Sequence, residues 1–424
     1  MPKLGFLIIL IISFPFLLMG QTYELDKLIS YGLENSYEIK QEEVSLQNYR
    51  SYLTSSWLGL LPQATVNASR TNQEVAIYND SGLATGSERE WTNAAGFSLT
   101  KSISLNEPSY YNIRTSILDK KNADLSYEDM RSAVAFNIFS LYLYVLEAEK
   151  NLSIQEENLK LQQKIYDQIQ VQYQTGEKSL LELKQSEISL IDYEIAVNEA
   201  ENSLMQQRQE LFRYLNLEDA GYDLIEPEFV VREEVVEYRD NNNLFEKRNS
   251  LHSSKLSSFQ QLMDFFPTLS LGYHYYSNST SQELDDFDSY DDSYTISLSA
   301  SYAIFDIFDK RESYLRTRRN LRLQELDLQI SEKELKEDLT NLESDIRTLR
   351  RSRDLYAEKL ELAASNLEMA QEQFRLGMIS ILDLDRAKLD HLNAQLSYNN
   401  RYYELIRKQE EINQTLSLPV LGKW

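Results

Sequence analysis

The chain has 424 residues, of which 67 are acidic and 43 basic, and it contains no Cys, 3 His, 12 Gly and 7 Pro. Without thiols it cannot form disulfides, Fe–S clusters, Cys-ligated zinc sites or a Cys nucleophile. The histidines have no metal-ligand spacing such as H-E-x-x-H; they are His252, His274 and His391. The formal charge of −24 argues against nucleic acid or anionic lipid headgroups as the main partner.

The first twenty residues have the pattern of a secretory signal peptide. Lys3 supplies a positive start, an apolar run extends from Leu4 to Met19, and Gly20 precedes a polar stretch that begins at Gln21. The alternative is an N-terminal membrane anchor, but a run of roughly 16 residues is shorter than the ~20 that span a bilayer. We therefore expect export and cleavage after Gly20. Because no Cys follows, a lipoprotein anchor is excluded.

Glycine and proline divide the rest of the chain into two copies of one unit, because long segments without either residue alternate with short punctuated ones. One stretch of the first copy corresponds, 201 residues later, to a stretch of the second: Tyr173-Gln-Thr-Gly-Glu-Lys-Ser-Leu-Leu-Glu-Leu183 matches Phe374-Arg-Leu-Gly-Met-Ile-Ser-Ile-Leu-Asp-Leu384. Leu61-Pro62 likewise matches Phe266-Pro267. We interpret these correspondences as a tandem duplication.

The duplication predicts the organisation of the whole chain. The expected segments are a signal peptide (1–20), a first repeat (21–220), an irregular insert (221–243), a second repeat (244–418) and a C-terminal tail (419–424). Each repeat is expected to contain a helix, two strands, a long helix and a shorter helix. The expected bounds are strands 63–78 and 91–105 with helices 108–175 and 178–217, then strands 267–277 and 293–305 with helices 309–376 and 378–416.

The long segments have the heptad periodicity of helices that pack against other helices. In the first copy, the apolar residues spaced by seven are Ile138, Val145, Leu152, Leu159, Tyr166 and Tyr173. Gln155 and Gln162 interrupt the companion seam, so the coil is imperfect or its partner surface is wider. A helix of this length, about 100 Å, needs neighbours along its length. Gly176 and Gly377 suit tight turns, at which each long helix turns back into a shorter antiparallel one.

Two segments alternate apolar residues with small hydroxyl residues at period two, namely 91–105 and 293–305. This alternation is typical of a barrel strand with lipid on one side and water on the other. The alternative is a soluble sheet with one face on a core. The export signal favours the barrel, and no later segment has 18 consecutive apolar residues for a membrane helix. Aromatic residues expected at the membrane interface are Trp91, Tyr273, Tyr275 and Tyr294.

Four strands cannot close a barrel, because about eight is the practical minimum. An open sheet would leave strand edges unsatisfied in lipid, so copies of the chain must assemble. Two, three or four protomers would give about 8, 12 or 16 strands. The predicted fold is an α+β membrane protein: a long α-helical coiled-coil barrel continuous with a transmembrane antiparallel β-barrel that forms by oligomerisation.

In the order of these elements the chain resembles the TolC family of outer-membrane efflux and secretion channels. The resemblance covers roughly residues 22–418 and includes the duplicated unit, the Leu-Pro and Phe-Pro pairs before the first strands, and the glycine turns. It implies a homotrimer in the outer membrane of a Gram-negative bacterium, with the helices extending into the periplasm. It also implies a periplasmic adaptor, an inner-membrane pump and outer-membrane lipid as partners, with neither a cofactor nor nucleic acid.

By the same resemblance, the turns between paired helices would dock a hairpin of the adaptor. The residues carried over are Thr175, Gly176, Ser179 and Leu180 in the first turn and Leu376, Gly377, Ser380 and Ile381 in the second. The resemblance also implies acidic rings at a periplasmic gate, with Glu182 and Asp383 at matching positions. Arg386 stands where a further acid is expected, with Asp385 nearby as a substitute. The alternative is that Glu182 and Asp383 are early-helix carboxylates complementing the helix dipole.

The leading functional hypothesis is a passive exit duct of a tripartite efflux or type I secretion system. The second is a periplasmic coiled-coil scaffold without a pore, which the long helices suit and the alternating strands do not. An enzyme is disfavoured because no nucleophile–base set, phosphate loop or metal-ligand spacing is present.

Two charged clusters have alternative interpretations. The acidic loop 283–292 either binds a divalent cation or is simply solvated. A basic cluster opens the second long helix, where it either meets lipid phosphates below the barrel or pairs with the many acids. Its members are Lys310, Arg311, Arg316, Arg318, Arg319 and Arg322.

Overall fold

The structure, a computed structural model, describes residues 22–229, 238–283 and 286–423. The predicted signal peptide lies outside the described residues. The chain divides into two compact units, and each unit takes segments from both sequence repeats. Unit 1 comprises Met1–Ile39, Met130–Glu237 and Leu339–Trp424, and unit 2 comprises Lys40–Asp129 and Tyr238–Asp338. The two compact units therefore do not coincide with the two predicted sequence repeats, because the two longest helices contribute residues to both units.

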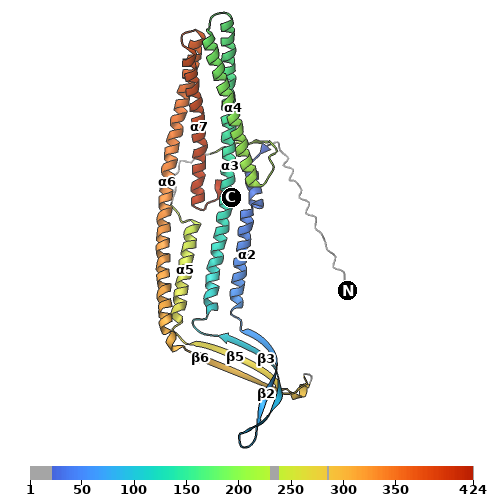
Figure 1. Ribbon diagram of the computed structural model, residues 1–424. Helices are drawn as coiled ribbons and strands as arrows, with labels where there is room; N and C mark the ends of the chain where they lie inside the picture. Colours follow the sequence, from blue (N-terminus) through green and yellow to red (C-terminus); the bar gives the residue numbers. More distant parts are fainter. Residues whose placement is uncertain (1–21, 230–237, 284–285, 424) are drawn as a thin grey trace. The chain divides into compact units, whose positions relative to one another are not determined.

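Unit 2 contains a four-stranded antiparallel sheet in the order β2-β3-β5-β6 (Figure 1). Its strands are β2 (Gln63–Tyr78), β3 (Ala84–Ser102), β5 (Thr268–Ser279) and β6 (Asp291–Ser301). Within the described residues, β2 and β6 each pair on one side only. One protomer therefore presents two open sheet edges. The backbone N–H and C=O groups of such an edge cannot remain without hydrogen-bond partners in lipid.

The register places most apolar side chains of the four strands on one face. Val66 pairs with Phe97, Phe97 with Tyr275, and Tyr275 with Tyr294. Because side chains alternate along a strand, this row and the rows two residues away share a face. The neighbouring row on the opposite face consists of Thr65, Ser98, His274 and Thr295. The alternation predicted from the sequence thus continues across the sheet, and the apolar face is exposed, with Val66 80% accessible.

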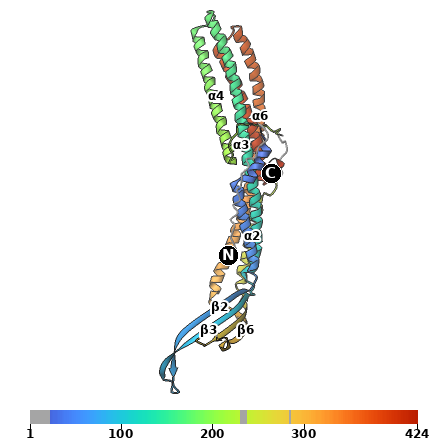
Figure 2. The same cartoon turned by 90° about the vertical axis from the view of Figure 1, so that its right-hand side faces the viewer.

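The bounds of two strands differ from the predicted ones. β3 begins at Ala84 rather than residue 91, because residues 84–91 pair with β2 as a two-stranded ribbon extending beyond β5 and β6 (Figure 2). Both faces of this ribbon carry polar residues, so the alternation signal is lost. At its other end β3 stops at Ser102 rather than residue 105. The Ser104 hydroxyl instead bonds the backbone of Leu269, accepting from its N–H at 2.6 Å and donating to its carbonyl at 3.1 Å.

β6 also ends earlier than predicted. It covers Asp291–Ser301 rather than 293–305, and the residues that follow form a 3₁₀ turn, Ile304–Asp306, directly before the next helix. The other two strands lie close to their predicted bounds, since β2 covers Gln63–Tyr78 and β5 covers Thr268–Ser279 against the predicted 267–277.

The helices of unit 2 are α2 (Tyr37–Leu58), α5 (Asn242–Met263) and the first parts of α3 (Pro108–Gln174) and α6 (Ile307–Arg375). Polar contacts join them. Asn249 of α5 donates to Asn122 of α3 at 2.7 Å, and Lys247 of α5 pairs with Asp327 of α6 at 2.7 Å. The single helix α5 therefore contacts both long helices.

Unit 1 contains two antiparallel helical hairpins, α3–α4 and α6–α7, which lie side by side in both views (Figures 1 and 2). α4 covers Leu180–Leu215, α7 covers Ile381–Thr415, and the short α1 covers Leu25–Asn35. The predicted helices 108–175, 178–217, 309–376 and 378–416 thus end within three residues of the observed ends. No helix within the described residues is both long and apolar enough to cross a bilayer.

The predicted irregular insert, residues 221–243, is described at 221–229 and 238–243, and this part contains a short strand. This strand, β4 (Asp223–Leu224), pairs in parallel with β1 (Thr22–Tyr23). The insert is shorter than predicted, because Asn241 already caps α5 and accepts a hydrogen bond from the N–H of Leu244 at 3.1 Å. The predicted tail packs on unit 1, where Val420 is buried and Lys423 pairs with Asp26 at 2.8 Å.

Candidate functional site at the helical turns

The two hairpin turns of unit 1 have the same backbone conformation. Gly176 has φ +83° and Gly377 has φ +71°, in the left-handed region that a glycine adopts without steric cost. The N–H of Gly176 donates to Tyr173 at 3.0 Å, and that of Gly377 donates to Phe374 at 3.0 Å. The next residue of each turn also donates back to the helix, in both cases at 2.8 Å. Each turn is thus a Schellman motif.

The helix after each turn begins with a capping box. The Ser179 hydroxyl accepts from the N–H of Glu182 at 3.2 Å, while the Glu182 carboxylate accepts from the N–H of Ser179 at 2.9 Å. Ser380 and Asp383 repeat the arrangement, with both distances 3.2 Å. The two predicted gate acids therefore satisfy backbone N–H groups that the helix cannot satisfy itself.

Hydrogen bonds at the caps lower the pKa of both acids. The ammonium of Lys178 and then the N–H of Ser179 hold the pKa of Glu182 below its ordinary value. The hydroxyl and then the N–H of Ser380 do the same for the pKa of the exposed Asp383. Both carboxylates are therefore ionised at neutral pH.

An apolar core joins the two hairpins beneath the turns. Ile165 and Ile169 of α3 pack there with Phe374 of α6 and with Ile381 and Leu384 of α7. Ile381 was predicted to contribute to docking, but its side chain is only 2% exposed and lies in this core. A second contact joins the turns themselves, because the ammonium of Lys178 lies 4.7 Å from the centre of the Phe374 ring. The two turns therefore form one surface, and the same apolar core lies beneath both.

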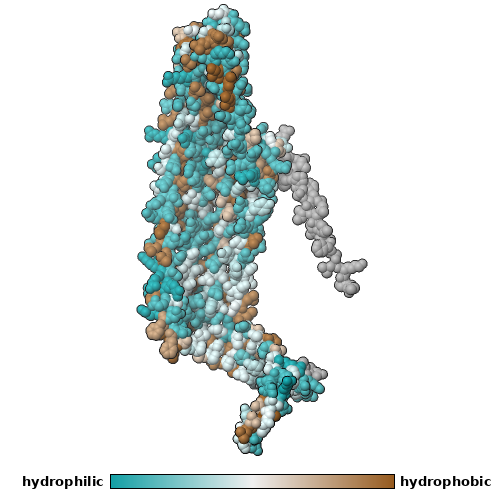
Figure 3. Space-filling model, viewed as in Figure 1, coloured by the Kyte–Doolittle hydropathy of each residue, from teal (hydrophilic) through white to brown (hydrophobic). Residues whose placement is uncertain are grey.

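Exposed apolar side chains surround the turns, as Figure 3 shows at the end of unit 1 that bears them. Their exposure ranges from 55% to 70%, and they are Leu180, Leu181, Leu376, Met378 and Leu382. The predicted docking residues Thr175, Gly176, Ser179, Gly377 and Ser380 are also exposed. A contiguous apolar patch on an otherwise strongly polar chain is typical of a protein interaction surface.

A groove of about 560 Å³ lies between α3 and α6 next to this patch. Its floor is apolar and includes Leu161, Ile165 and Phe374, and its rim is charged and includes Lys164 and Arg375. Arg375 pairs with Glu372 on the same helix at 2.5 Å, and both side chains are largely exposed. The groove could therefore hold an apolar ridge of a partner while its rim makes polar contacts.

Below the turns, a lysine is buried between three helices. Lys388 of α7 is 1% exposed and donates a hydrogen bond to the amide oxygen of Gln162 of α3, which is 0% exposed. Its ammonium pairs with Asp385 at 2.8 Å and lies 5.1 Å from the centre of the Tyr193 ring of α4. Burial lowers the pKa of Lys388, and Asp385 opposes this shift.

The remaining bonds of this cluster connect α3 and α7 to α4. The Gln162 amide donates to the carbonyl of Ser186 at 3.2 Å, and the Ser189 hydroxyl donates to Asp385 at 3.0 Å. Asp385, predicted as a substitute gate acid, is therefore bound to Lys388 and Ser189. Arg386 beside it is exposed.

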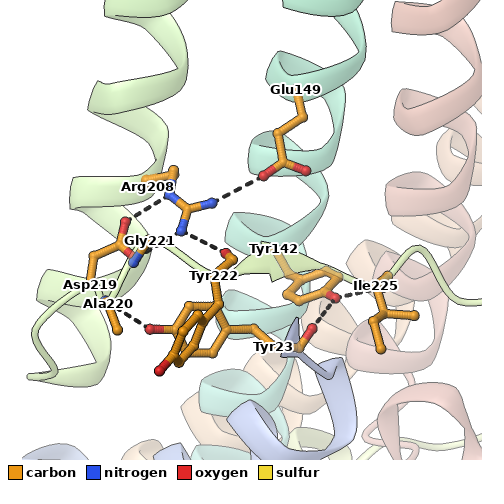
Figure 4. A network of polar contacts seen from close by, with 9 residues as sticks. All are labelled: Tyr23, Tyr142, Glu149, Arg208, Asp219, Ala220, Gly221, Tyr222 and Ile225. Carbon is orange, nitrogen blue, oxygen red and sulfur yellow. Dashed lines mark hydrogen bonds and ion pairs between the residues drawn. The ribbon is translucent and has the colours of Figure 1, made fainter. Parts of the chain in front are cut away.

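A second polar network holds β1 and β4 against the helices of unit 1 (Figure 4). Arg208 of α4 pairs with Asp219 at 2.7 Å and with Glu149 of α3 at 3.1 Å, and it donates to the carbonyl of Tyr222 at 2.9 Å. Burial raises the pKa of Glu149, and Arg208 opposes this. The sequence pattern gave no signal for this network, because its members lie between Tyr23 and Ile225, far apart in the chain, and follow no periodic spacing.

The Tyr142 hydroxyl extends the network by donating to the carbonyls of Tyr23 at 3.0 Å and Ile225 at 2.6 Å. Tyr23 is the last residue of β1, and Ile225 directly follows β4. These contacts fasten β1 and β4 to α3 and α4. Among the described residues, no group of three or more His, Cys, Asp or Glu could hold a metal ion.

The predicted interface aromatics all lie on the apolar face of the sheet. Tyr273 stacks on Tyr294 with ring centres 6.4 Å apart, and Tyr275 is the register partner of Tyr294. Trp91 lies under the guanidinium of Arg70, 4.2 Å from its ring centre. Tyr273 occupies the middle of β5 rather than its end, so its position is the least suited to an interface girdle.

Comparisons with known proteins agree with this architecture. The sequence model of the family described as outer membrane efflux protein matches residues 28–217 and 259–417, one segment in each repeat. A comparison with curated proteins finds no match.

Three solved structures show the similarity of fold. The CmeC outer membrane channel of Campylobacter jejuni has 19% identity and a TM-score of 0.80, over 93% of this chain and 85% of that one. VceC of Vibrio cholerae has 12% identity and a TM-score of 0.81, over 93% and 96%. The MtrE channel of Neisseria gonorrhoeae, in its open state, has 13% identity and a TM-score of 0.74, over 93% and 89%.

The family match covers more than half of the chain and decides between the functional classes considered above. The apolar face of the sheet is the lipid-facing side of a transmembrane barrel that closes only on oligomerisation, and the helices extend into the periplasm. The protein is a channel rather than an enzyme or a scaffold without a pore. The chain belongs to the outer membrane efflux protein family.

Proposed function

We propose that the protein is the passive exit duct of a tripartite efflux or type I secretion system. In this proposal three copies close a barrel of about 12 strands, which is wider than the barrels of about eight strands whose interiors side chains can fill. The duct itself does no chemistry. An inner-membrane pump supplies the energy and selects the cargo, and a periplasmic adaptor connects the pump to the helical turns.

The exposed apolar patch at the two turns carries the docking part of this proposal. Leu181 of the first turn and Leu382 of the second are 67% and 60% exposed. Because the turns share one backbone conformation, an adaptor that fits the first can also fit the second. The adjoining groove between α3 and α6 offers an apolar floor to a helical hairpin of that adaptor.

We further propose that Asp383 and Glu182 contribute to a narrow, acidic periplasmic gate. Three ionised Asp383 side chains around one axis would favour cations. Their capping role is compatible with this, because a carboxylate that accepts bonds from Ser380 keeps its charge. In planar bilayers, Asp383→Asn should reduce cation selectivity. Unchanged selectivity would leave Asp383 with its capping role alone.

The docking proposal is tested with Leu181→Glu combined with Leu382→Glu. We expect the variant channel to lose the periplasmic adaptor that co-purifies with the wild type when the complex is affinity-purified, because two carboxylates per protomer would be desolvated at the interface. Ile195→Glu is the matched control, since Ile195 is exposed on α4 away from the turns. Equal adaptor retention by all three proteins would exclude the turns as the docking surface.

A further inference from the structure

The junction between β6 and α6 continues the lipid-facing side of the sheet. On β6 this side carries residues at every second position, including Tyr294, Ile296 and Leu298, and Tyr302 falls on the same alternation just after the strand. The residues that follow are apolar and highly exposed, with Phe305 88% and Phe308 73% accessible. An exposed aromatic group at the periplasmic end of a membrane strand is typical of the bilayer interface.

Positive side chains begin within one helical turn of these aromatic residues. The ammonium of Lys310 lies 5.0 Å from the centre of the Tyr302 ring, so it lies on the side of the junction that Tyr302 occupies. Arg311 follows, and its contact is with the adjacent Glu312 at 3.3 Å, with both side chains well exposed. Among the described residues, no carboxylate forms an ion pair with Lys310.

Placing cations here has an energetic cost, because the start of a helix carries the positive end of its dipole. Lys310 and Arg311 both fall within the first turn and a half of α6, which begins at Ile307. Asp309, in the same first turn, offsets part of this cost. An anion supplied from outside the chain would offset more of it. Although the whole chain has a net charge of −24, the stretch 310–322 contains six basic residues and one acid, and it is preceded by Asp306 and Asp309.

We propose that the β6–α6 junction is a binding site for anionic phospholipid headgroups in the periplasmic leaflet. Tyr302, Phe305 and Phe308 insert at the interface, while Lys310 and Arg311 contact the headgroup phosphates. This proposal uses the membrane location that family membership establishes and does not depend on the adaptor or the gate. The proposed ligand is an anionic rather than a zwitterionic phospholipid, because a zwitterionic headgroup offers no net negative charge.

Among the basic residues at the start of α6, only Lys310 and Arg311 lie close enough to the bilayer to contact headgroups. The headgroup region is about 5–7 Å thick on each side of the bilayer. A helix rises about 1.5 Å per residue, so Arg318 and Arg319 lie roughly 12–13 Å further along α6 than Lys310. They are therefore beyond direct contact with headgroups. Arg318 lies over the Tyr314 ring at 6.0 Å, which is consistent with a separate environment.

The test measures lipid binding to the intact channel assembly in a non-ionic detergent. Phosphatidylglycerol is titrated in a background of phosphatidylcholine, and native mass spectrometry gives the apparent Kd. Lys310→Gln with Arg311→Gln should weaken phosphatidylglycerol binding at least about tenfold, given about fivefold for each charge at a membrane surface. Arg318→Gln with Arg319→Gln removes the same charge and should leave the Kd unchanged. Lys310→Arg with Arg311→Lys should restore binding.

Three results would overturn the proposal. The first is equal binding by the wild type and the Lys310/Arg311 variant. The second is an equal loss in the Arg318/Arg319 variant, which would indicate a diffuse field rather than a site. The third is dissociation of the Lys310/Arg311 variant into single subunits in phosphatidylcholine alone, because Lys310 and Arg311 would then pair with acids of a second copy.

Discussion

Lys388 and Gln162 form a hydrogen bond between α7 and α3 although both side chains are almost fully buried. Gln162 interrupts the apolar seam of the long helix, and the structure explains why: it accepts a hydrogen bond from the buried ammonium of Lys388, 226 residues further along the chain. Burying a charge is costly unless it is paired, and here Asp385 and Gln162 share that role.

This relationship predicts that the two residues depend on each other. Gln162→Leu should lower the free energy of unfolding by about 1.5–3 kcal/mol, because the ammonium of Lys388 loses an acceptor. Adding Lys388→Leu should recover most of that loss, since apolar side chains can replace a buried ionic contact. Lys184→Leu, at an exposed lysine on α4, should change stability by less than about 1 kcal/mol. Thermal unfolding followed by circular dichroism compares the variants. If the double variant were no more stable than Gln162→Leu, the two residues would not be coupled.

The capping boxes predict local rather than global effects at the turns. Ser179→Ala or Ser380→Ala should cost about 1 kcal/mol of helix-terminal stability. Hydrogen exchange in the peptides that span the turns should then accelerate about fivefold, with little change elsewhere. Ser203→Ala is the matched control because Ser203 is exposed within α4. Unaltered exchange at the turns in both cap variants would show that the caps do not stabilise them.

The lowered pKa of Glu182 and Asp383 predicts how the turns respond to pH. Their ordinary values are 4.5 and 3.8, and the folded values lie below these. An acid with a depressed pKa stabilises the fold above its unfolded pKa, and this contribution is lost as pH falls through the folded pKa. Protection of the turns should therefore weaken below about pH 4. Glu182→Gln with Asp383→Asn should remove most of this pH dependence, whereas a persistent dependence would assign it to other groups.

The open edges β2 and β6 predict a specific set of cross-links between copies. The chain has no Cys, so introduced cysteines are the only thiols. Ser299 on β6 lies on the polar face, as do Thr65 and Asn67 on β2. Ser299→Cys should form disulfides between copies with cysteine at one of these β2 positions, but not with Val66→Cys, because alternate residues face opposite sides. Cross-linking through Val66 alone would reverse the assignment of the faces.

Much of the fold could be predicted because its signals are periodic. Helix ends followed from Gly176 and Gly377, and strand faces from the alternation of apolar and hydroxyl residues. The polar ribbon of β3 before residue 91 was missed, because two solvated faces leave no alternation to detect.

The site was predicted less completely. The capping boxes were not predicted, although the sequence carries their signal, since Ser179 and Ser380 are each followed three residues later by an acid. The buried position of Ile381 was not visible, because its counterpart Leu180 is exposed and the two repeats differ in packing. The partner of Gln162 could not be found either, since a lysine in a helix normally indicates a solvated face.

The account depends most on closure of one barrel by several copies of the four-stranded sheet. Native mass spectrometry of the detergent-solubilised protein measures this directly. We predict a species with the mass of three mature chains that requires detergent to stay in solution. A single chain that is monodisperse in buffer without detergent would contradict the account.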